Sequence, residues 1–404
     1  MIRIELREGA PYQEVTLTSA QAAMLADSEV IELARGPRPG LSRVRAKHLI
    51  GSARFGSGSD TIEVRIAPKI DIHRLLFLVG YAPGQGDWRE PEVDAAEYLD
   101  LLPAVAYMFV RAAERALRQG VLLGYRQVEA ALPTVRGRIR EVDQYGRGYG
   151  LPLPVEVRYD DYTADVAENR LLLAAAVRLL RLPGIPAEVR RPLHRLRLRL
   201  DGVSDVPRGE VPRWRRSRLN ARYQTVLGLA ELVLRGGSYE MTDGSIVRVD
   251  GLLLHMWQVF ENFVTLALID ALRSYGGHCR CQDRHHLDHG RRVGLRPDLV
   301  YYGAKSGERD EPVSVVDAKY KIERSADNPA LYQMLAYCTV LGLSGGHLVY
   351  AKGETEPTTH VINGPQNIQI TQHALDLNLP PARLLGQISA LAALVVNHDK
   401  LGGL

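Results

Sequence analysis

Two strand-like segments that each carry an aspartate constrain this sequence more than any other feature. The segment VSVVDAKYKI at 313–322 is rich in β-branched and aromatic residues, so it predicts a strand. Successive side chains on a strand point to opposite faces, which places Asp317 and Lys319 on the same face. The segment RPDLVYY at 296–302 is also strand-like. The polar stretch between them is short enough to close a hairpin that brings Asp298 beside Asp317.

Two carboxylates held this close repel each other unless a cation lies between them. A hard divalent ion with oxygen ligands meets this requirement, so we expect Mg²⁺, with Mn²⁺ able to substitute. The alternative interpretation is that Asp317 and Lys319 belong to a solvated strand face, and that Asp298 is only a turn residue.

A helix is predicted upstream of this pair. The segment WQVFENFVTLALIDAL at 257–272 has apolar residues at helical spacing, and Trp257, Val264 and Leu268 share a face with Glu261. A carboxylate on an apolar helix face requires an explanation, unless Glu261 is an ordinary surface residue.

A second helix is predicted downstream, in the segment NPALYQMLAYCTVL. Asn328 caps it and Pro329 begins it. Helical spacing then places Gln333 and Tyr337 one turn apart on one side.

In this order, the two helices and two strands resemble the PD-(D/E)XK nuclease core, in the subgroup with a Gln-x-x-x-Tyr helix. The catalytic residues that the resemblance implies are Glu261, Asp298, Asp317, Lys319, Gln333 and Tyr337. In such a core the three acids hold the metal, and the lysine activates the attacking water or stabilises the charged phosphorane. The glutamine and the tyrosine line the site.

Bulk composition limits the class of protein. A chain of 404 residues with 46% hydrophobic residues is long enough for two or three domains with real cores. Three cysteines suit a reducing compartment, and neither an apolar signal core nor a spanning apolar stretch occurs, so we expect a cytoplasmic protein without a membrane segment. A net charge of only +4 means that attraction to nucleic acid must come from local patches.

The sequence divides into three regions. Residues 1–92 are β-rich, with one clear helix predicted at TSAQAAMLA, and predict a partner-binding domain. Residues 93–235 are largely helical, with an arginine-bearing hairpin at 124–146, and predict partner docking and a linker. Residues 236–404 contain the nuclease motifs. The expected fold class is α/β with an α+β N-terminal part, and the C-terminal core is a mixed sheet flanked by helices. No phosphate-binding glycine motif occurs, so no nucleotide is expected on this chain alone.

Two arginine groups are candidates for contact with DNA or a partner. The first lies in the alternating segment VRGRIR and comprises Arg136, Arg138 and Arg140. The second surrounds Trp214 and comprises Arg213, Arg215, Arg216 and Arg218. Arginines beside aromatic residues suit phosphate contact and stacking. A charged edge strand for the first group and a solvated linker helix for the second are the alternatives.

The segment 278–289 concentrates cysteine and histidine. Cys279 and Cys281 are only two positions apart, whereas structural zinc sites usually show Cys-x-x-Cys spacing. This spacing favours a polar loop over a zinc site, and zinc binding remains to be tested by elemental analysis.

Together with the nuclease motifs, three further segments are similar to McrC, the endonuclease subunit of McrBC-type modification-dependent restriction systems. They are APKI at 67–70, GYRQVEAALPTVRGRI at 124–139 and YDDYTADVAENRLL at 159–172. The resemblance implies that residues 1 to about 235 dock onto a hexameric AAA+ motor of the McrB type, which hydrolyses GTP or ATP. It also implies that the C-terminal part cuts double-stranded, modified DNA.

The expected function is therefore that of a Mg²⁺-dependent endonuclease subunit in a McrBC-like defence complex. One alternative is a DNA repair or recombination nuclease that works without a motor, and another is a non-cutting adaptor between a motor and DNA. The sequence leaves open which modification triggers cutting, which nucleotide the partner uses, the stoichiometry, and whether one metal or two are bound.

Overall fold

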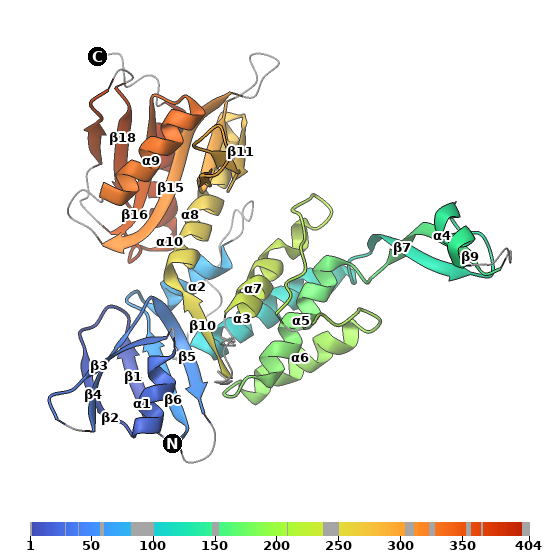
Figure 1. The fold of residues 1–404 in the computed structure, drawn as a ribbon, viewed down its shortest axis with the longest axis horizontal. Helices are drawn as coiled ribbons and strands as arrows, with labels where there is room; N and C mark the ends of the chain where they lie inside the picture. Colours follow the sequence, from blue (N-terminus) through green and yellow to red (C-terminus); the bar gives the residue numbers. More distant parts are fainter. Residues whose placement is uncertain are drawn as a thin grey trace. The chain divides into compact units, whose positions relative to one another are not determined.

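The computed structural model divides the chain into two compact units, Met1–Leu101 with Ser238–Leu404, and Leu102–Gly237 (Figure 1). The residues that it describes are 2–28, 30–38, 40–56, 60–81, 101–147, 153–207, 209–236, 250–303, 311–322, 328–352, 357–364 and 367–397. Residues 304–310, which form most of the predicted connection between the two aspartate strands, and residues 82–100 lie outside this set.

The N-terminal part of the first unit contains two sheets. The larger has the order β1 (Ile2–Arg7), β6 (Ile62–Ala67), β5 (Leu49–Phe55) and β10 (Asp250–His255). The smaller has the order β2 (Gln13–Thr16), β4 (Leu41–Ala46) and β3 (Ile31–Arg35). The predicted helix is α1 (Ser19–Ala26), in which Thr18 and Gln21 cap each other's backbone amides. The β-rich character expected for this region is therefore present.

Strand β10 joins this sheet although it follows the second unit in the chain. It pairs antiparallel with β5, with Leu253 opposite Gly51. A Cβ on Gly51 would lie 2.1 Å from the Leu252 carbonyl oxygen, and one on Gly251 would lie 2.0 Å from the Ser52 carbonyl oxygen. Glycine at both positions allows this close approach of the two backbones.

A helix that the sequence did not predict, α2 (Ile72–Gly80), follows β6. The Asp71 carboxylate caps it by accepting a hydrogen bond of 2.8 Å from the His73 amide. Its apolar run LLFLV is short, and periodicity alone does not separate a short buried helix from a buried strand.

The C-terminal part of the first unit is built on a six-stranded mixed sheet. Its order is β11 (His278–Cys281), β14 (Leu299–Tyr302), β15 (Pro312–Ile322), β16 (Gly345–Lys352), β18 (Gln369–Ala374) and β17 (Thr358–Val361). Strands β15, β16 and β18 run parallel, whereas the other pairings are antiparallel. A small separate pair consists of β12 (His285–His286) and β13 (Gly294–Leu295).

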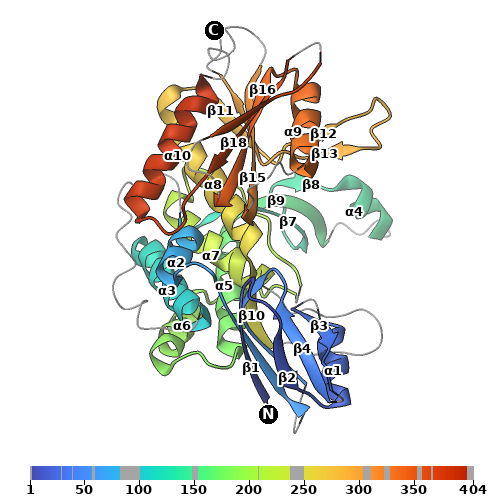
Figure 2. The same ribbon diagram turned by 90° about the vertical axis from the view of Figure 1, so that its left-hand side faces the viewer.

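Helices cover both faces of this sheet. Helices α8 (Met256–Leu272) and α10 (Pro381–Val396) pack together on one face, and α9 (Asn328–Leu341) packs on the other (Figure 2). The single turn η5 (Arg273–Tyr275) ends α8. The predicted α/β class, with a mixed sheet flanked by helices, is confirmed.

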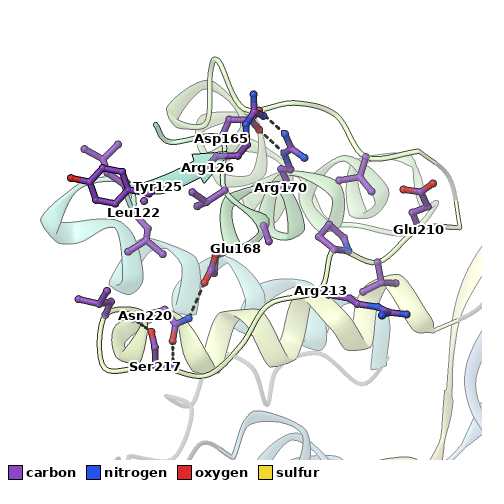
Figure 3. A pocket seen from close by; sticks show the side chains of 18 of the residues that line it. Leu122, Tyr125, Arg126, Asp165, Glu168, Arg170, Glu210, Arg213, Ser217 and Asn220 are labelled. Atoms are coloured by element: carbon purple, nitrogen blue, oxygen red, sulfur yellow. Dashed lines mark hydrogen bonds and ion pairs between the residues drawn. The ribbon is translucent and has the colours of Figure 1, made fainter. Parts of the chain in front are cut away.

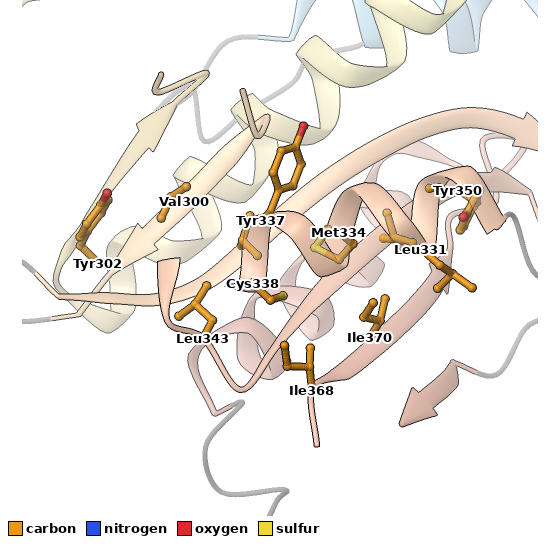
Figure 4. Packing of buried hydrophobic residues seen from close by; sticks show 13 residues of the cluster. Val300, Tyr302, Leu331, Met334, Tyr337, Cys338, Leu343, Tyr350, Ile368 and Ile370 are labelled. Atoms are coloured by element: carbon orange, nitrogen blue, oxygen red, sulfur yellow. The ribbon is translucent and has the colours of Figure 1, made fainter. Parts of the chain in front are cut away.

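The core beneath α9 holds that helix against the strands that carry the aspartates (Figure 4). Val315 and Leu348 of the sheet and Met334 and Cys338 of the helix are all fully buried. Their packing fixes the position of the Gln-x-x-x-Tyr segment over the sheet.

The second unit combines helices with a long β-ribbon. Its helices are α3 (Leu101–Ala116), α5 (Ala167–Arg181), α6 (Ala187–Arg199) and α7 (Gln224–Arg235), with single turns η3 (Leu117–Gln119) and η4 (Ala221–Tyr223). The ribbon consists of β7 (Gly124–Leu132), β9 (Val155–Thr163), β8 (Arg138–Ile139) and the short helix α4 (Glu141–Arg147).

The ribbon differs from the predicted hairpin in its pairing. The long partner of β7 is β9, and the predicted arginine strand is reduced to the two residues of β8, which also pairs with β9. Residues 160–163, within the segment 159–172 that is similar to McrC, are the last residues of β9. Alternation within each segment was visible in the sequence, whereas the pairing of strands distant in the chain was not.

Candidate functional site

Strands β14 and β15 bring the two predicted aspartates together. They pair antiparallel with Leu299 opposite Val316, and the next position along this register places Asp298 opposite Asp317. The Ala318 amide donates a hydrogen bond of 2.9 Å to Asp298 Oδ2, which ties the first carboxylate to the second strand. The predicted hairpin pairing is present, although its connection lies outside the described residues.

Lys319 lies directly against this pair. Its Nζ is 2.6 Å from Asp317 Oδ2, and the Asp317 side chain is only 3% exposed. The contact is an ion pair between the ammonium group and a buried carboxylate. An ammonium group thus provides the cation that two adjacent carboxylates require.

Glu261 of α8 belongs to the same electrostatic cluster. Burial, followed by the charges of Asp298 and Asp317, raises the pKa of Glu261 to about 8, and Lys319 opposes this rise. Burial and the charge of Asp317 likewise raise the pKa of Asp298 to about 6, against the Ala318 hydrogen bond. Burial also raises the pKa of Asp317, although Lys319 lowers it. The structure therefore brings all four predicted charged residues into one interacting set.

The helix face predicted around Glu261 is only partly correct. Val264 and Leu268 are buried, whereas Trp257 is 43% exposed. Glu261 lies at the boundary of the buried face, since it is half-buried.

These residues fit a divalent cation in their chemistry. Carboxylate oxygens are hard ligands, and a bound cation would lower the cost of ionising one buried and two half-buried acids together. Within the described part of the chain, no three acidic, histidine or cysteine side chains are arranged closely enough to enclose a metal ion as they stand. In this structure the Ala318 amide binds Asp298 and Lys319 binds Asp317, while Glu261 interacts with them through its charge.

The Gln-x-x-x-Tyr segment of α9 supports the first aspartate. Gln333 Nε2 donates a hydrogen bond of 2.7 Å to Tyr337 Oη, which in turn donates one of 3.2 Å to the Arg296 carbonyl oxygen. Burial, followed by the charge of Asp317, raises the pKa of Tyr337, so the hydroxyl remains a donor. Tyr337 thus holds the backbone two residues before Asp298.

The arginines of the ribbon are engaged to different degrees. Arg136 makes a 2.9 Å ion pair with Asp161 and lies over the Tyr159 ring. Arg140 is half-buried and pairs with Glu129 at 3.0 Å. Arg138, between them, is exposed. Internal carboxylates therefore engage two of the three arginines, and contact of this group with DNA or a partner stays a prediction.

The second arginine group lies in irregular backbone before η4. Its four members, Arg213, Arg215, Arg216 and Arg218, are all exposed. The interleaved Trp214 is fixed by a hydrogen bond of 3.0 Å from its Nε1 to Glu231. The predicted basic surface is present, without the linker helix considered as an alternative.

A polar centre that the sequence did not single out lies at the base of the ribbon. It lines a cavity of about 590 Å³ within the second unit (Figure 3). Asp165 accepts hydrogen bonds of 2.6 Å from both Arg170 Nε and Arg170 Nη2, one of 2.7 Å from Ser204 Oγ, and also pairs with Arg126. The Arg170 and Ser204 hydrogen bonds hold the pKa of Asp165 well below its usual range, despite burial. This centre joins β7 to α5.

The cysteine-rich segment shows no assembled zinc site. Cys279 lies on β11 opposite Tyr301, and burial raises the pKa of its thiol to about 12. Among the described residues of 278–289, no group of three metal-binding side chains forms.

A family model described as a McrBC 5-methylcytosine restriction system component matches residues 44–351. The chain belongs to this McrBC family. The match includes the ribbon, both aspartate strands and the helix with Tyr337, so the resemblance predicted from the motifs is confirmed. A comparison with curated proteins found no match.

Two solved assemblies from Thermococcus gammatolerans are similar in structure. One is a refined half-complex from a tetradecameric assembly of McrB AAA+ hexamers with bound McrC, with 17% identity and a TM-score of 0.46 over 96% of this chain and 98% of that chain. The other is a McrBC complex determined by electron cryo-microscopy, with 17% identity and a TM-score of 0.39 over 68% of this chain and 89% of that chain. Within the residues described, no helix of this McrBC-family chain is long and apolar enough to cross a membrane.

Proposed function

We propose that this chain is the McrC-type nuclease subunit of its restriction system and hydrolyses DNA phosphodiester bonds with Mg²⁺. The observation that carries the proposal is the pairing of Asp298 with Asp317 on adjacent strands, with Lys319 Nζ 2.6 Å from the second carboxylate. A solvated strand face does not explain this arrangement, because Asp317 is buried.

Each charged residue has a distinct part in this proposal. Asp298, Asp317 and Glu261 would hold the metal ion, which when bound would activate water and neutralise charge on the scissile phosphate. Tyr337 keeps Asp298 in position through the Arg296 carbonyl. In this proposal the three acids bind and position the metal ion, and water is the nucleophile.

Lys319 serves as a cationic donor in this scheme. Burial acts to lower its pKa, but Asp317, Asp298 and Glu261 raise it above the usual value. The amine therefore stays protonated at neutral pH. It can donate to the attacking water or to a phosphoryl oxygen, and so stabilise the negative charge that develops in the transition state.

The β-ribbon is the proposed docking element for a motor partner. A restriction system component implies other components, and this sequence carries no phosphate-binding glycine motif of its own. At the α4 end of the ribbon, Val142 is 86% exposed and Tyr145 is 83% exposed. Exposed apolar side chains of this kind are typical of surfaces that a partner covers. We assign the partner as a McrB-type AAA+ GTPase or ATPase, and the complex to the cytoplasm.

The exposed arginines near Trp214 provide the proposed contact with duplex DNA. Their guanidinium groups can bind phosphates bidentately, and such contacts are independent of sequence. Recognition of the modified base is assigned to the partner.

The test is cleavage of methylated and unmethylated plasmid by the chain together with the AAA+ protein encoded beside it. We expect Mg²⁺-dependent cutting by the wild type. Asp298→Ala and Lys319→Ala should each reduce it by a factor of at least about 100, because each removes charge at the reacting centre. Both variants should still bind the partner. Lys321→Ala is the matched control, since Lys321 is exposed on the same strand, and it should cut normally.

Undiminished cutting by Asp298→Ala or Lys319→Ala would refute the site. Cutting that needs no ATPase would identify a motor-independent repair or recombination nuclease. Absence of cutting by the wild type, with partner and DNA binding intact, would identify a non-cutting adaptor.

A further inference from the structure

A hydrogen bond joins the catalytic strand to the N-terminal sheet of the same unit. Tyr320, the residue after Lys319, donates from its hydroxyl to Glu8 Oε2 over 3.2 Å. Glu8 directly follows β1 and is only 6% exposed. Buried carboxylates are rare unless they are bound on several sides, so this one requires an explanation.

Glu8 is held rigidly from its own side. Its Oε2 also accepts a hydrogen bond of 3.2 Å from the Lys69 amide, and its own amide donates one of 2.9 Å to the Ala67 carbonyl oxygen. Ala67 is the last residue of β6 and Lys69 lies two residues beyond it, and both belong to the APKI segment that contributed to the family resemblance. The carboxylate is therefore a fixed acceptor at the adjoining ends of two parallel strands.

The ring of Tyr320 contacts the helix that carries Glu261. Its centroid lies 5.9 Å from that of Phe260, with the ring planes at 53°. Phe260 is fully buried and immediately precedes Glu261. The Tyr320 ring thus contacts the helix that carries Glu261, and its hydroxyl binds Glu8 beside the N-terminal sheet. Tyr320 also directly follows Lys319 in the chain.

We infer that Glu8 and Tyr320 form a positioning pair that sets the spacing between β15 and α8, and hence between Lys319, Asp317 and Glu261. Neither residue touches substrate or metal. The hydroxyl, anchored on Glu8, fixes the ring against Phe260, and the ring fixes the separation of the acids contributed by strand and helix. This inference rests on the proposed nuclease function of that site.

Residues that orient metal ligands from outside typically alter metal affinity by roughly 10- to 100-fold when changed. Tyr320→Phe and Glu8→Ala should therefore each raise the half-saturating Mg²⁺ concentration for cutting by about tenfold. The KM for DNA should change little. Glu8→Gln keeps an acceptor oxygen and should restore most of the wild-type affinity for Mg²⁺. The double variant Glu8→Ala/Tyr320→Phe should be no worse than the poorer single variant, since both remove the same contact.

Tyr301→Phe is the matched control. Tyr301 lies on the adjacent strand, and its hydroxyl donates a hydrogen bond of 2.9 Å to the Gly276 carbonyl oxygen. The substitution removes a comparable tyrosine hydrogen bond from the same sheet, away from Glu8. It should leave the Mg²⁺ requirement within about twofold of wild type, whatever its effect on the melting temperature.

The same variants are compared by Mn²⁺ binding to the chain alone, measured by electron paramagnetic resonance, which needs neither partner nor DNA. Weaker Mn²⁺ binding by Tyr320→Phe but not by Tyr301→Phe supports the positioning pair. If Tyr320→Phe and Tyr301→Phe bind Mn²⁺ equally well, the positioning pair is overturned. It is also overturned if the effects of Glu8→Ala and Tyr320→Phe multiply in the double variant. If the wild type neither binds Mn²⁺ nor cuts DNA, the proposed function itself is refuted. If the wild type cuts normally and Tyr320→Phe binds Mn²⁺ as tightly as the wild type, only the positioning pair is refuted.

Discussion

Burial of three carboxylates around one amine determines the protonation state of the site. The pKa of Glu261 is raised to about 8 and that of Asp298 to about 6, in each case first by burial and then by neighbouring acids. Near neutral pH and without a metal ion, Glu261 is therefore largely protonated. A divalent cation binds the ionised form, so it must displace protons from these groups.

Metal affinity should consequently rise with pH. Below pH 6 both Asp298 and Glu261 carry protons and the affinity is lowest. Between about pH 6 and pH 8 they ionise in turn, and the affinity for Mg²⁺ or Mn²⁺ increases. Isothermal titration calorimetry at pH 6, 7 and 8, in buffers that differ in ionisation enthalpy, measures both the affinity and the protons released.

Glu261→Gln separates the two ionisations. It removes the group that titrates near pH 8, so the remaining rise in affinity should be complete by about pH 7. An affinity for Mn²⁺ that does not vary between pH 6 and pH 8 in the wild type would show that these acids are not the ligands.

At the scale of elements, packing between β16 and α9 is tight enough to be tested by a single methyl group. A Cβ on Gly346 would lie 2.4 Å from Met334 Sδ and 2.9 Å from Val315 Cγ1. Gly346→Ala should therefore destabilise the first unit by roughly 1–3 kcal/mol, as overpacked cores do. Urea unfolding followed by circular dichroism measures the change in the free energy of unfolding.

Gly386→Ala provides the opposite case. Gly386 lies inside α10, and a Cβ there would meet no atom within 4 Å beyond its chain neighbours and the backbone of its own helix. Alanine at an exposed helix position should stabilise the fold by roughly 0.5–1 kcal/mol, because it reduces the freedom of the unfolded chain. If both substitutions changed stability in the same direction, the packing described for Gly346 would be wrong.

The elements of the candidate site were predictable because their patterns are local. The alternation in VSVVDAKYKI and the helical spacing around Glu261 and Tyr337 each involve fewer than 20 neighbouring residues. Helix α2 and the pairing of β7 with β9 were not predicted. In α2 the apolar run is too short to show its period, and 22 residues lie between the end of β7 and the start of β9, beyond any local signal.

At the scale of the whole molecule, the candidate site and the ribbon belong to different compact units. The clustered acids and Lys319 lie in the unit Met1–Leu101 with Ser238–Leu404, and the ribbon lies in Leu102–Gly237. The sequence predicted both features but not that β10 would complete the N-terminal sheet, because that pairing joins residues some 200 positions apart. The contact between Glu8 and Tyr320 was unpredictable for the same reason.

This separation predicts that the ribbon can be removed without loss of metal binding. Gln127 and Asp160 are opposite each other in the β7–β9 register, so residues 128–159 can be replaced by Asn-Gly, a dipeptide suited to a two-residue hairpin turn. The shortened chain should bind Mn²⁺ within about twofold of wild type, yet lose cutting that depends on the ATPase. Val142→Asp in the full-length ribbon should also weaken partner binding, because it places a charge in the apolar surface. Retained ATPase-dependent cutting by the shortened chain would assign docking to another surface, and lost Mn²⁺ binding would show that the two units depend on each other.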